Sequence, residues 1–293
     1  MPDAYKPAPT QIRTVAIISK PRVERAAEMV PGLVRWLTER HINVHMDEQT
    51  ALYAGSKEGF PRDAVPEGAD LVIVLGGDGT LLAAARAVGP RDIPLLAVNL
   101  GNLGFLTAIT VEELYPQLER VLRGEYQMSR RAKLRVEHLR EGRVLESYEA
   151  LNDACIAKSE IARIIDLEAH VDGHRMSVYK GDGLIISTPT GSTAYSLSAG
   201  GPIVFPTVAG HCITPICPHM LTQRSVIVPD DKVIKIVLRS GNTTYLTVDG
   251  QAGSLLMEGD EVVCRRSEQS IRLIRQEGQS FFDVLREKLT WGG

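Results

Sequence analysis

The chain lacks the features that mark several common classes of protein. It has 293 residues and a net charge of −3, so no strong field draws the whole molecule to nucleic acid or to a membrane surface. The first 11 residues contain no apolar run behind a basic start, which argues against a signal peptide. Only four cysteines occur, none in a Cys-x-x-Cys pair, and such sparing use is typical of a reducing compartment. We therefore expect a soluble cytoplasmic protein with neither nucleic acid nor membrane as a partner.

Charge is missing altogether from one long segment. Residues 183–223 contain no Asp, Glu, Lys or Arg. A membrane span is disfavoured there because Ser, Thr and Gly dominate the segment and prolines interrupt it, namely Pro189, Pro202, Pro206, Pro215 and Pro218. In a soluble protein, a long uncharged polar stretch indicates packed backbone near a ligand.

The same segment holds a loose cluster of possible metal ligands, His211, Cys212, Cys217 and His219. Zinc is one interpretation, since Cys and His are its usual ligands. The spacing fits no common zinc knuckle, however, and two prolines interrupt it. We therefore favour buried thiols and ordinary histidines over a zinc site.

The first part of the chain alternates strand-like and helix-like segments. Short apolar runs such as residues 71–75 are typical of strands buried on both faces. Residues 21–40 have apolar side chains at helical spacing, with a kink or split expected at Pro31 and Gly32. This alternation predicts an α/β domain with a mainly parallel sheet over residues 1–128.

The pattern changes to that of a β-rich domain over residues 129–275. Apolar and polar residues alternate in residues 133–139 and 144–151, as in half-buried strands. Asp172-Gly173 is a hairpin signal between two such runs. Residues 276–293 contain a last helix, which we expect to pack back on the first domain.

The strongest local signal is the run Gly76-Gly77-Asp78-Gly79-Thr80, which follows a strand and precedes a helix. Glycines let the backbone approach a phosphate closely, and successive N–H groups at a helix N-terminus favour an anion. A bare carboxylate would repel phosphate, so Asp78 suggests a proton acceptor or a partner for Mg²⁺. A cap for the following helix is the alternative, and the motif alone does not separate the two.

Commoner nucleotide signatures are absent from the sequence. No Gly-Lys dipeptide occurs, so there is no Walker A loop. Residues 77–82 begin like Gly-x-Gly-x-x-Gly but end in Leu82, so the dinucleotide fingerprint fails as well.

Two further segments carry polar groups suited to a nucleotide. Residues 181–201 contain Asp182 and a dense set of hydroxyls, from Thr188, Thr190, Ser192, Thr193, Tyr195, Ser196 and Ser198. Hydroxyls and glycine amides bind phosphate and ribose oxygens without adding charge, and the Tyr195 ring can stack on a base. The adjacent pair Asn152-Asp153 suits hydrogen bonds to a purine edge and ribose, although a turn or cap is the commoner role of such a pair.

Taken in order, these motifs resemble those of bacterial NAD kinases. The resemblance runs from about Val15 to the C-terminus and rests on GGDGT at residues 76–80, NLGFLT at 102–107, LND at 151–153, the hydroxyl-rich segment at 181–202, and VDGQ at 248–251. GGDGT alone also occurs in related lipid kinases, whereas the hydroxyl-rich segment is highly specific.

The resemblance implies a phosphotransferase that converts ATP and NAD into ADP and NADP. It implies that Asp78 is the general base for the 2′-hydroxyl of the adenosine ribose, that Gly76, Gly77, Gly79 and Thr80 border the phosphates, and that Asn152 and Asp153 hold the adenosine. Further NAD contacts are implied for Gly79, Arg163, Lys180, Asp182, Thr193, Ala194, Tyr195, Ser196, Leu197, Ser198 and Gln251. The pair is Asn-Asp where many members have Asn-Glu, a change that keeps the charge.

The resemblance also implies partners. NAD and ATP are the expected substrates, and the family tends to form dimers or tetramers. Transfer of a γ-phosphoryl group needs a divalent ion, Mg²⁺ or Mn²⁺, for which the sequence shows no ligand set.

Two rival functions remain open at this point. A lipid kinase would share GGDGT but would need an apolar acceptor pocket, which the hydroxyl-rich segment does not favour. A non-catalytic NAD(H) or NADP(H) sensor would keep the pair Asn152-Asp153 but would not need Asp78.

Overall fold

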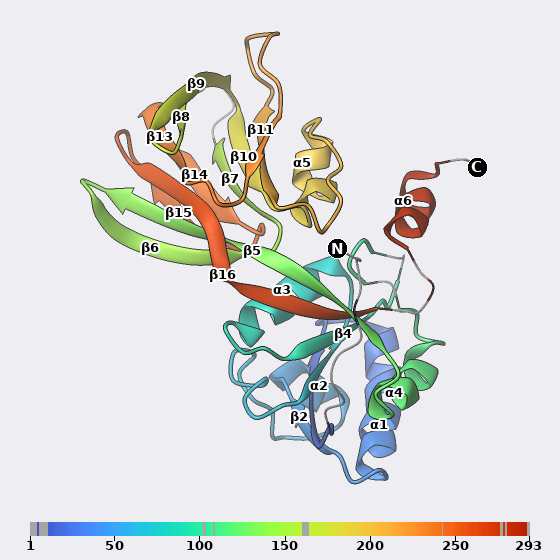
Figure 1. Cartoon of the computed structure of the whole chain (residues 1–293). Coiled ribbons are helices and arrows are strands. Elements are labelled where there is room, and N and C mark those ends of the chain that lie inside the picture. Colours follow the sequence, from blue (N-terminus) through green and yellow to red (C-terminus); the bar gives the residue numbers. More distant parts are fainter. Residues whose placement is uncertain are drawn as a thin grey trace. The chain divides into compact units, whose positions relative to one another are not determined.

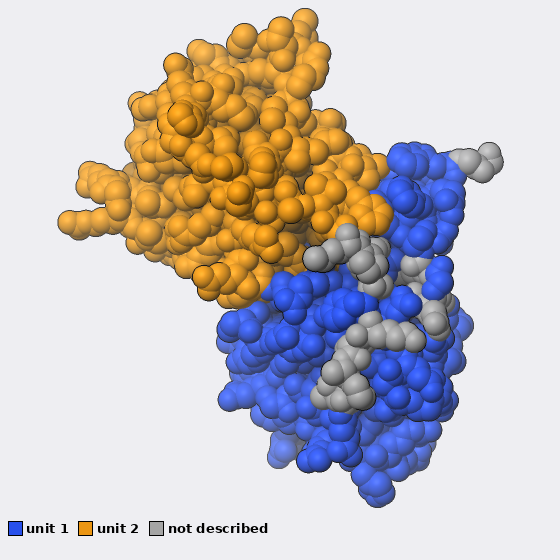
Figure 2. Space-filling model, viewed as in Figure 1, with its two compact units in different colours: residues 1–130, 270–293 blue, residues 131–269 orange. Residues whose placement is uncertain are grey.

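The computed structural model describes residue 5 and residues 11–101, 104–107, 109–159, 164–241, 243–275, 278 and 280–291. It divides into two compact units (Figure 2): unit 1 comprises residues 1–130 and 270–293, and unit 2 comprises residues 131–269. The second boundary lies a few residues before the expected position at 275, because one long strand carries residues of both units. The last helix belongs to unit 1.

Unit 1 contains a parallel sheet in the order β2-β1-β3-β4, whose last strand also pairs in parallel with Arg272 and Leu273 of β16 (Figure 1). The strands are β1 (Thr14–Ser19), β2 (Asn43–Met46), β3 (Leu71–Leu75), β4 (Pro94–Val98) and β16 (Glu261–Arg275). The helices are α1 (Glu24–Thr38), α2 (Glu48–Tyr53), α3 (Asp78–Val88), α4 (Leu114–Leu122) and α6 (Phe281–Leu289). The predicted α/β fold with a mainly parallel sheet is confirmed.

Helices cover both faces of this sheet. Val15 and Ile17 of β1 share a core with α1 and α4, whereas Ala16 and Ile18 are buried on the other face, where α3 packs. Helix α1 does not split at Pro31 as the sequence suggested. Its buried residues keep helical spacing past the proline, so packing against the sheet outweighs the missing hydrogen bond.

Unit 2 is antiparallel and β-rich, as predicted. One sheet has the order β12-β11-β10-β7-β14-β15, and a second set of strands runs β16-β13-β8-β9, with β5 paired to β6. The strands are β5 (Gln127–Arg140), β6 (Arg143–Ala150), β7 (Asp153–Lys158), β8 (Ile165–Val171), β9 (His174–Gly181), β10 (Gly183–Ser187), β11 (Gly210–Ile216), β12 (Val226–Pro229), β13 (Ile234–Ser240), β14 (Thr244–Val248) and β15 (Ala252–Leu256). Two short helices, η1 (Gly191–Thr193) and α5 (Tyr195–Ser198), follow β10.

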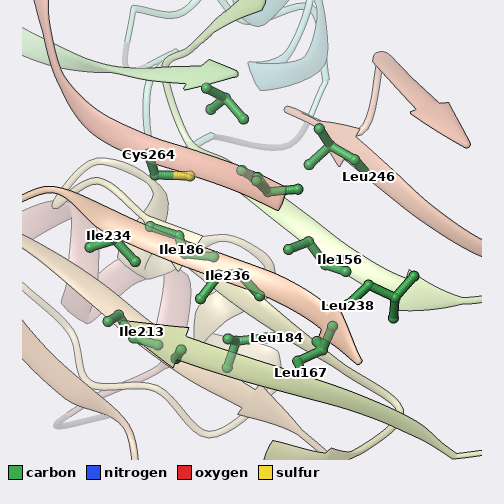
Figure 3. Close-up of a cluster of buried hydrophobic side chains, with 14 of the residues drawn as sticks. Ile156, Leu167, Leu184, Ile186, Ile213, Ile234, Ile236, Leu238, Leu246 and Cys264 are labelled. Atoms are coloured by element: carbon green, nitrogen blue, oxygen red, sulfur yellow. The ribbon is translucent and has the colours of Figure 1, made fainter. Parts of the chain in front are cut away.

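The hydrophobic core of unit 2 occupies one face of its six-stranded sheet (Figure 3). Side chains of the six-stranded sheet such as Ile156 and Ile186 pack against Ile236 and Cys264 of the other strands. Because side chains alternate along a strand, the residues between these point to the opposite face. That face carries a small apolar cluster that includes Cys155, together with polar residues of β7, β10 and β11.

None of the helices within the described residues has the length and apolarity needed to cross a membrane.

Candidate active site

The GGDGT run forms the turn between β3 and α3 in unit 1. Gly77 is the N-cap of α3, and the amide of Gly76 donates to the carbonyl of Val98, at the end of the neighbouring strand (3.0 Å). A Cβ on Gly76 would lie 2.3 Å from Oγ1 of Thr80, so this position requires glycine. A Cβ on Gly77 or Gly79 would meet nothing within 4 Å, so the turn is open on that side. An open turn at a helix N-terminus suits a phosphate.

Asp78 does not cap its own helix, because the N-cap Gly77 of α3 has no side-chain cap and the Asp78 carboxylate is turned to a different loop. Its Oδ2 accepts a hydrogen bond from the amide of Phe105 (2.9 Å). Its Oδ1 accepts from the amides of Leu106 (3.1 Å) and Thr107 (3.2 Å) and from Oγ1 of Thr107 (3.0 Å). Asp78 therefore anchors the loop after β4, a role that the sequence analysis missed.

The anchored loop is built for this close approach. A Cβ on Gly104 would lie 2.0 Å from Oδ1 of Asp78, so only glycine fits there. The side-chain amide of Asn99 donates to Oγ1 of Thr107 (3.0 Å), and its oxygen accepts from the amide of Gly101 (2.7 Å). These contacts give a physical reason for the NLGFLT motif. Its first two residues, 102 and 103, lie outside the described part of the chain.

A second carboxylate arranges the Asn152-Asp153 pair in unit 2. Asp249, in the turn after β14, accepts hydrogen bonds from the amides of Leu151 (2.9 Å), Asn152 (2.7 Å) and Asp153 (3.1 Å). The amide of Asp249 donates in return to the carbonyl of Asp153 (2.9 Å). Sequence reasoning noted the VDGQ run but assigned a role only to Gln251.

Buried polar atoms without partners lie at the same place. Within the described residues, Oδ1 of Asn152 and Oγ of Ser187 are buried and have no hydrogen-bond partner. Ser187 of β10 is directly opposite Asp153 of β7. Each such atom costs about 1–3 kcal/mol unless something binds it. A polar ligand that supplied the missing bonds would therefore be stabilised here.

Asp153 itself is buried, with 6% of its surface exposed. Burial first, and the negative charge of Asp249 second, raise the pKa of Asp153 to about 7. The carboxyl thus changes its charge near neutral pH, unlike an ordinary aspartate.

Several hydroxyls of the uncharged segment make hydrogen bonds within the protein. Thr188 donates to the carbonyl of Leu151 (2.6 Å), Ser192 to that of Pro189 (2.7 Å), and Ser196 contacts Oγ1 of Thr214 (3.0 Å). The sequence analysis expected these hydroxyls to bind ribose and phosphate oxygens. These bonds hold the loop in place, and those of Thr188 attach it to Leu151 and Asn152.

The predicted NAD contacts of this segment divide by exposure. Thr193 and Ser196 are buried, Ala194 and Leu197 are half-buried, and Tyr195 and Ser198 are exposed. Tyr195, on the short helix α5 that packs on β10, has 47% of its surface exposed. Its ring is therefore accessible for stacking.

The remaining predicted residues are held in ion pairs or lie in turns. Nζ of Lys180 is 3.2 Å from Oδ2 of Asp166, and Oδ1 of Asp182 is 2.6 Å from Nζ of Lys158. Gln251 follows the turn of Asp249 and is exposed. Arg163 lies outside the described residues.

Metal ligands do not gather anywhere in the described part of the chain, where no group of three or more His, Cys, Asp or Glu is placed to hold an ion. His211 and Cys212 are buried, and Cys217 is exposed. Burial raises the pKa of the Cys212 thiol, whose sulfur is 3.2 Å from Oγ1 of Thr214. Both oxygens of Asp78 accept amide hydrogen bonds, so the residues present fit an ion that arrives with substrate phosphates better than an ion held by protein ligands.

The open glycine turn of unit 1 and the unpaired buried polar atoms of unit 2 are features that suit a nucleotide-binding phosphotransferase. Comparison with known proteins agrees. Residues 15–126 match the family model of the ATP-NAD kinase N-terminal domain, and residues 151–276 match that of the ATP-NAD kinase C-terminal domain. The chain belongs to the ATP-NAD kinase family.

Similar proteins cover nearly the whole chain. The NAD kinase of Solibacter usitatus is 58% identical over 282 residues, which is 96% of this chain and 98% of that protein. The NAD kinase of Koribacter versatilis is 48% identical over 286 residues, with 96% and 99% covered. Among solved structures, yeast NADH kinase in complex with NADH is similar with a TM-score of 0.89 and 26% identity, over 97% of this chain and 89% of that one.

Proposed function

We propose that this protein transfers the γ-phosphoryl group of ATP to the 2′-hydroxyl of the adenosine ribose of NAD, giving NADP and ADP. The observation that carries the proposal is the set of unpaired buried polar atoms at the Asn152-Asp153 pair, within a chain of the ATP-NAD kinase family. Relatives named NAD kinase at up to 58% identity support the same reaction.

The β-rich unit would bind the adenosine. The unpaired Oδ1 of Asn152 is an acceptor for an exocyclic amine, and the Asp153 carboxylate is an acceptor for ribose hydroxyls. The exposed ring of Tyr195 would stack against the base. Further contacts are proposed for Arg163, Lys180, Asp182, Thr193, Ala194, Ser196, Leu197, Ser198 and Gln251, as the family resemblance implies.

The glycine turn of unit 1 would bind phosphate, at the open side of Gly77 and Gly79 and close to Gly76 and Thr80. Asp78 would take the proton of the 2′-hydroxyl. A carboxylate has about four lone-pair sites, and within the described residues Oδ2 accepts one hydrogen bond, so this oxygen keeps capacity for the ribose hydroxyl. The 2′-oxygen then bonds to the γ-phosphorus, and the bond to the bridging oxygen breaks with its electron pair leaving on ADP.

A divalent ion, Mg²⁺ or Mn²⁺, would enter with ATP and neutralise charge on the phosphoryl oxygens. We also propose that the protein is cytoplasmic, since all four cysteines are free thiols, and that it forms a homo-oligomer, a dimer or tetramer, as the resemblance implies.

The test is a direct assay. Purified protein is incubated with NAD, ATP and Mg²⁺, and NADP is measured with an NADP-specific dehydrogenase, with ATP omitted as the control. We expect ATP-dependent formation of NADP. ATP hydrolysis or phosphorylation of a lipid without NADP would refute the proposal, and NAD binding without turnover would identify a sensor.

A further inference from the structure

Three consecutive amides converge on a single carboxylate beside the proposed adenosine site. They belong to Leu151, Asn152 and Asp153, and all three donate to Asp249 at 2.7–3.1 Å. Successive amides that point into one concavity usually bind an anion. In this chain the anion is a side chain from 96 to 98 residues further along.

Asp249 sits in a turn that does not need its carboxylate. The turn joins β14 to β15, and Asp249 and Gly250 have φ of +52° and +62°. Asp-Gly is an ordinary sequence for a hairpin turn, because both residues tolerate positive φ. The turn alone therefore explains the backbone of Asp249. It does not explain why the side chain reaches a distant segment.

A buried lysine supplies the opposite charge. Lys133 of β5 is 1% exposed, and burial lowers its pKa while the charges of Glu149 and Asp249 raise it. Glu149 in turn is bonded to Arg135, whose Nη1 lies 3.1 Å from Oε1. Nearby negative charge helps a buried lysine to keep its proton. Lys133, whose Nζ is 3.5 Å from Oε1 of Gln269, is thus a counter-charge for Glu149 and Asp249.

We propose that Asp249, with Lys133 as its counter-charge, is a positioning residue that fixes the main chain of Leu151 to Asp153 so that Asn152 and Asp153 meet the adenosine. This proposal rests on the proposed function. Asp249 and Lys133 would influence both the orientation and the charge of the pair Asn152-Asp153.

The charge effect follows from the groups that face Asp153. Asp249 faces it from the turn after β14, Cys155 from β7, which also carries Asp153, and Tyr195 from α5. The pKa values of Cys155 and Tyr195 are themselves raised, first by burial and in part by the charge of Asp153. Asp249 is the one of these three whose charge contributes to the raised pKa of Asp153. Removing that charge should move the pKa of Asp153 down.

The experiment compares Asp249→Asn with wild type. The asparagine oxygen can still accept from two of the three amides, so most of the arrangement is kept while the charge is lost. We expect the KM for NAD to rise about tenfold and the KM for ATP to change less than about threefold. The pH below which the KM for NAD rises should be lower than in the wild type.

Asp172→Asn is the matched control. Asp172 also lies in an Asp-Gly hairpin turn of unit 2 at positive φ. Within the described residues its carboxylate accepts from the amide of Val233 (2.9 Å) and pairs with Lys232 (2.9 Å), neither of which belongs to the proposed site. We expect this variant to keep the wild-type KM and pH profile. If Asp249→Asn behaves like Asp172→Asn, or if it raises both KM values equally, the proposal is overturned.

Hydrogen exchange separates this proposal from the function on which it rests. Amide exchange at residues 151–153 should accelerate in Asp249→Asn and not in Asp172→Asn, and this measurement needs no turnover. Absence of NADP formation by the wild type would refute the function alone. Unchanged exchange at residues 151–153 would overturn the positioning role even in an active enzyme, and so would lost protection with an unchanged KM for NAD.

Discussion

At the scale of single residues, Asp78 and Asp249 have the same kind of role in the part of the chain that the structure describes. Asp78 accepts from the amides of Phe105, Leu106 and Thr107, and Asp249 accepts from three consecutive amides around Asn152. In each case a carboxylate organises a loop that is remote in sequence. Substituting either residue therefore changes both the chemical group at the site and the order of the loop that it holds. The experiments need controls that separate these two effects.

Asp78→Asn tests the base. The substitution keeps the size of the side chain but cannot accept a proton, so we expect kcat to fall about 10²–10⁴-fold. NAD affinity, measured by calorimetry, should change less than about tenfold. Near-normal turnover would refute the catalytic assignment.

Thr107→Val is the control for loop order. It removes one hydrogen bond to Oδ1 of Asp78 and leaves the carboxylate in place. One hydrogen bond is worth about 0.5–1.5 kcal/mol, so kcat should fall by no more than about tenfold. A loss as large as that of Asp78→Asn would mean that Asp78 acts mainly as a loop anchor.

Asp153 predicts a pH dependence. Because the pKa of its carboxyl is raised to about 7, the residue loses its charge, and one acceptor, below that pH. We expect the KM for NAD to rise by up to about tenfold per pH unit below pH 7, with little change in the KM for ATP. In Asp153→Asn this rise should be absent; if it persists, another group causes it.

The same shift has a consequence for stability, which thermal unfolding can check. A carboxyl with a pKa of about 7 when folded and about 3.9 when unfolded binds more protons in the native state between those values. Its contribution to the free energy of unfolding therefore falls as pH rises from about 4 to about 7, and is constant above. Wild type should accordingly be more stable relative to Asp153→Asn at pH 5 than at pH 8.

At the scale of elements, periodicity predicted the strands and helices well but not the contacts between loops. A continuous apolar run correctly indicated β3, and alternating apolar residues correctly indicated the β-rich second part. The carboxylate–amide bonds of Asp78 and Asp249 join segments 27–29 and 96–98 residues apart, and such pairs leave no periodic signature. The internal bonds of Thr188, Ser192 and Ser196 could not be predicted for a related reason, since composition does not reveal which side of a loop faces the protein.

Gly104→Ala tests the loop after β4. A Cβ there would lie 2.0 Å from Oδ1 of Asp78 and 2.3 Å from Oγ1 of Thr107, so the loop must shift. Overpacking of this kind costs about 1–3 kcal/mol, and we expect kcat/KM to fall about tenfold or more. Gly101→Ala is the control, because its Cβ would lie 4.0 Å from the nearest atom. In steady-state kinetics, kcat/KM should fall more in Gly104→Ala than in Gly101→Ala. Equal values in the two variants would mean that the loop has no role.

Lys180, on β9, tests the choice between NAD and NADH. Oxidised NAD carries a positive nicotinamide ring, so removing a nearby cation should favour it. We expect Lys180→Gly to remain active and to raise the ratio of kcat/KM for NAD over NADH. Asp166→Asn removes the ion-pair partner of Lys180 and should lower that ratio. An unchanged ratio in both variants would reject the idea.

At the scale of the whole molecule, the two units carry different parts of the proposed reaction. The glycine turn and Asp78 belong to unit 1, and the pair Asn152-Asp153 with its supporting Asp249 belongs to unit 2. The kinetic effects of substitutions should divide in the same way.

Replacing both Asn152 and Asp153 by Ala tests this division. Each lost bond to the adenosine costs about 1–3 kcal/mol, so the KM for NAD should rise about tenfold or more, with a smaller effect on the KM for ATP. Thermal unfolding serves as the control for folding. Equal rises for both substrates would point to a misassigned site.

Unit 1 is assembled from two stretches of chain that are far apart, because Arg272 and Leu273 of β16 pair with Pro94 and Leu95 of β4. During synthesis on the ribosome, residues 1–130 emerge first, yet their sheet has an open edge until β16 has been translated. An exposed edge strand is a site for aggregation. Ribosome stalling or premature termination within unit 2 would thus release a nascent chain with an unprotected sheet, which makes it a natural client for chaperones.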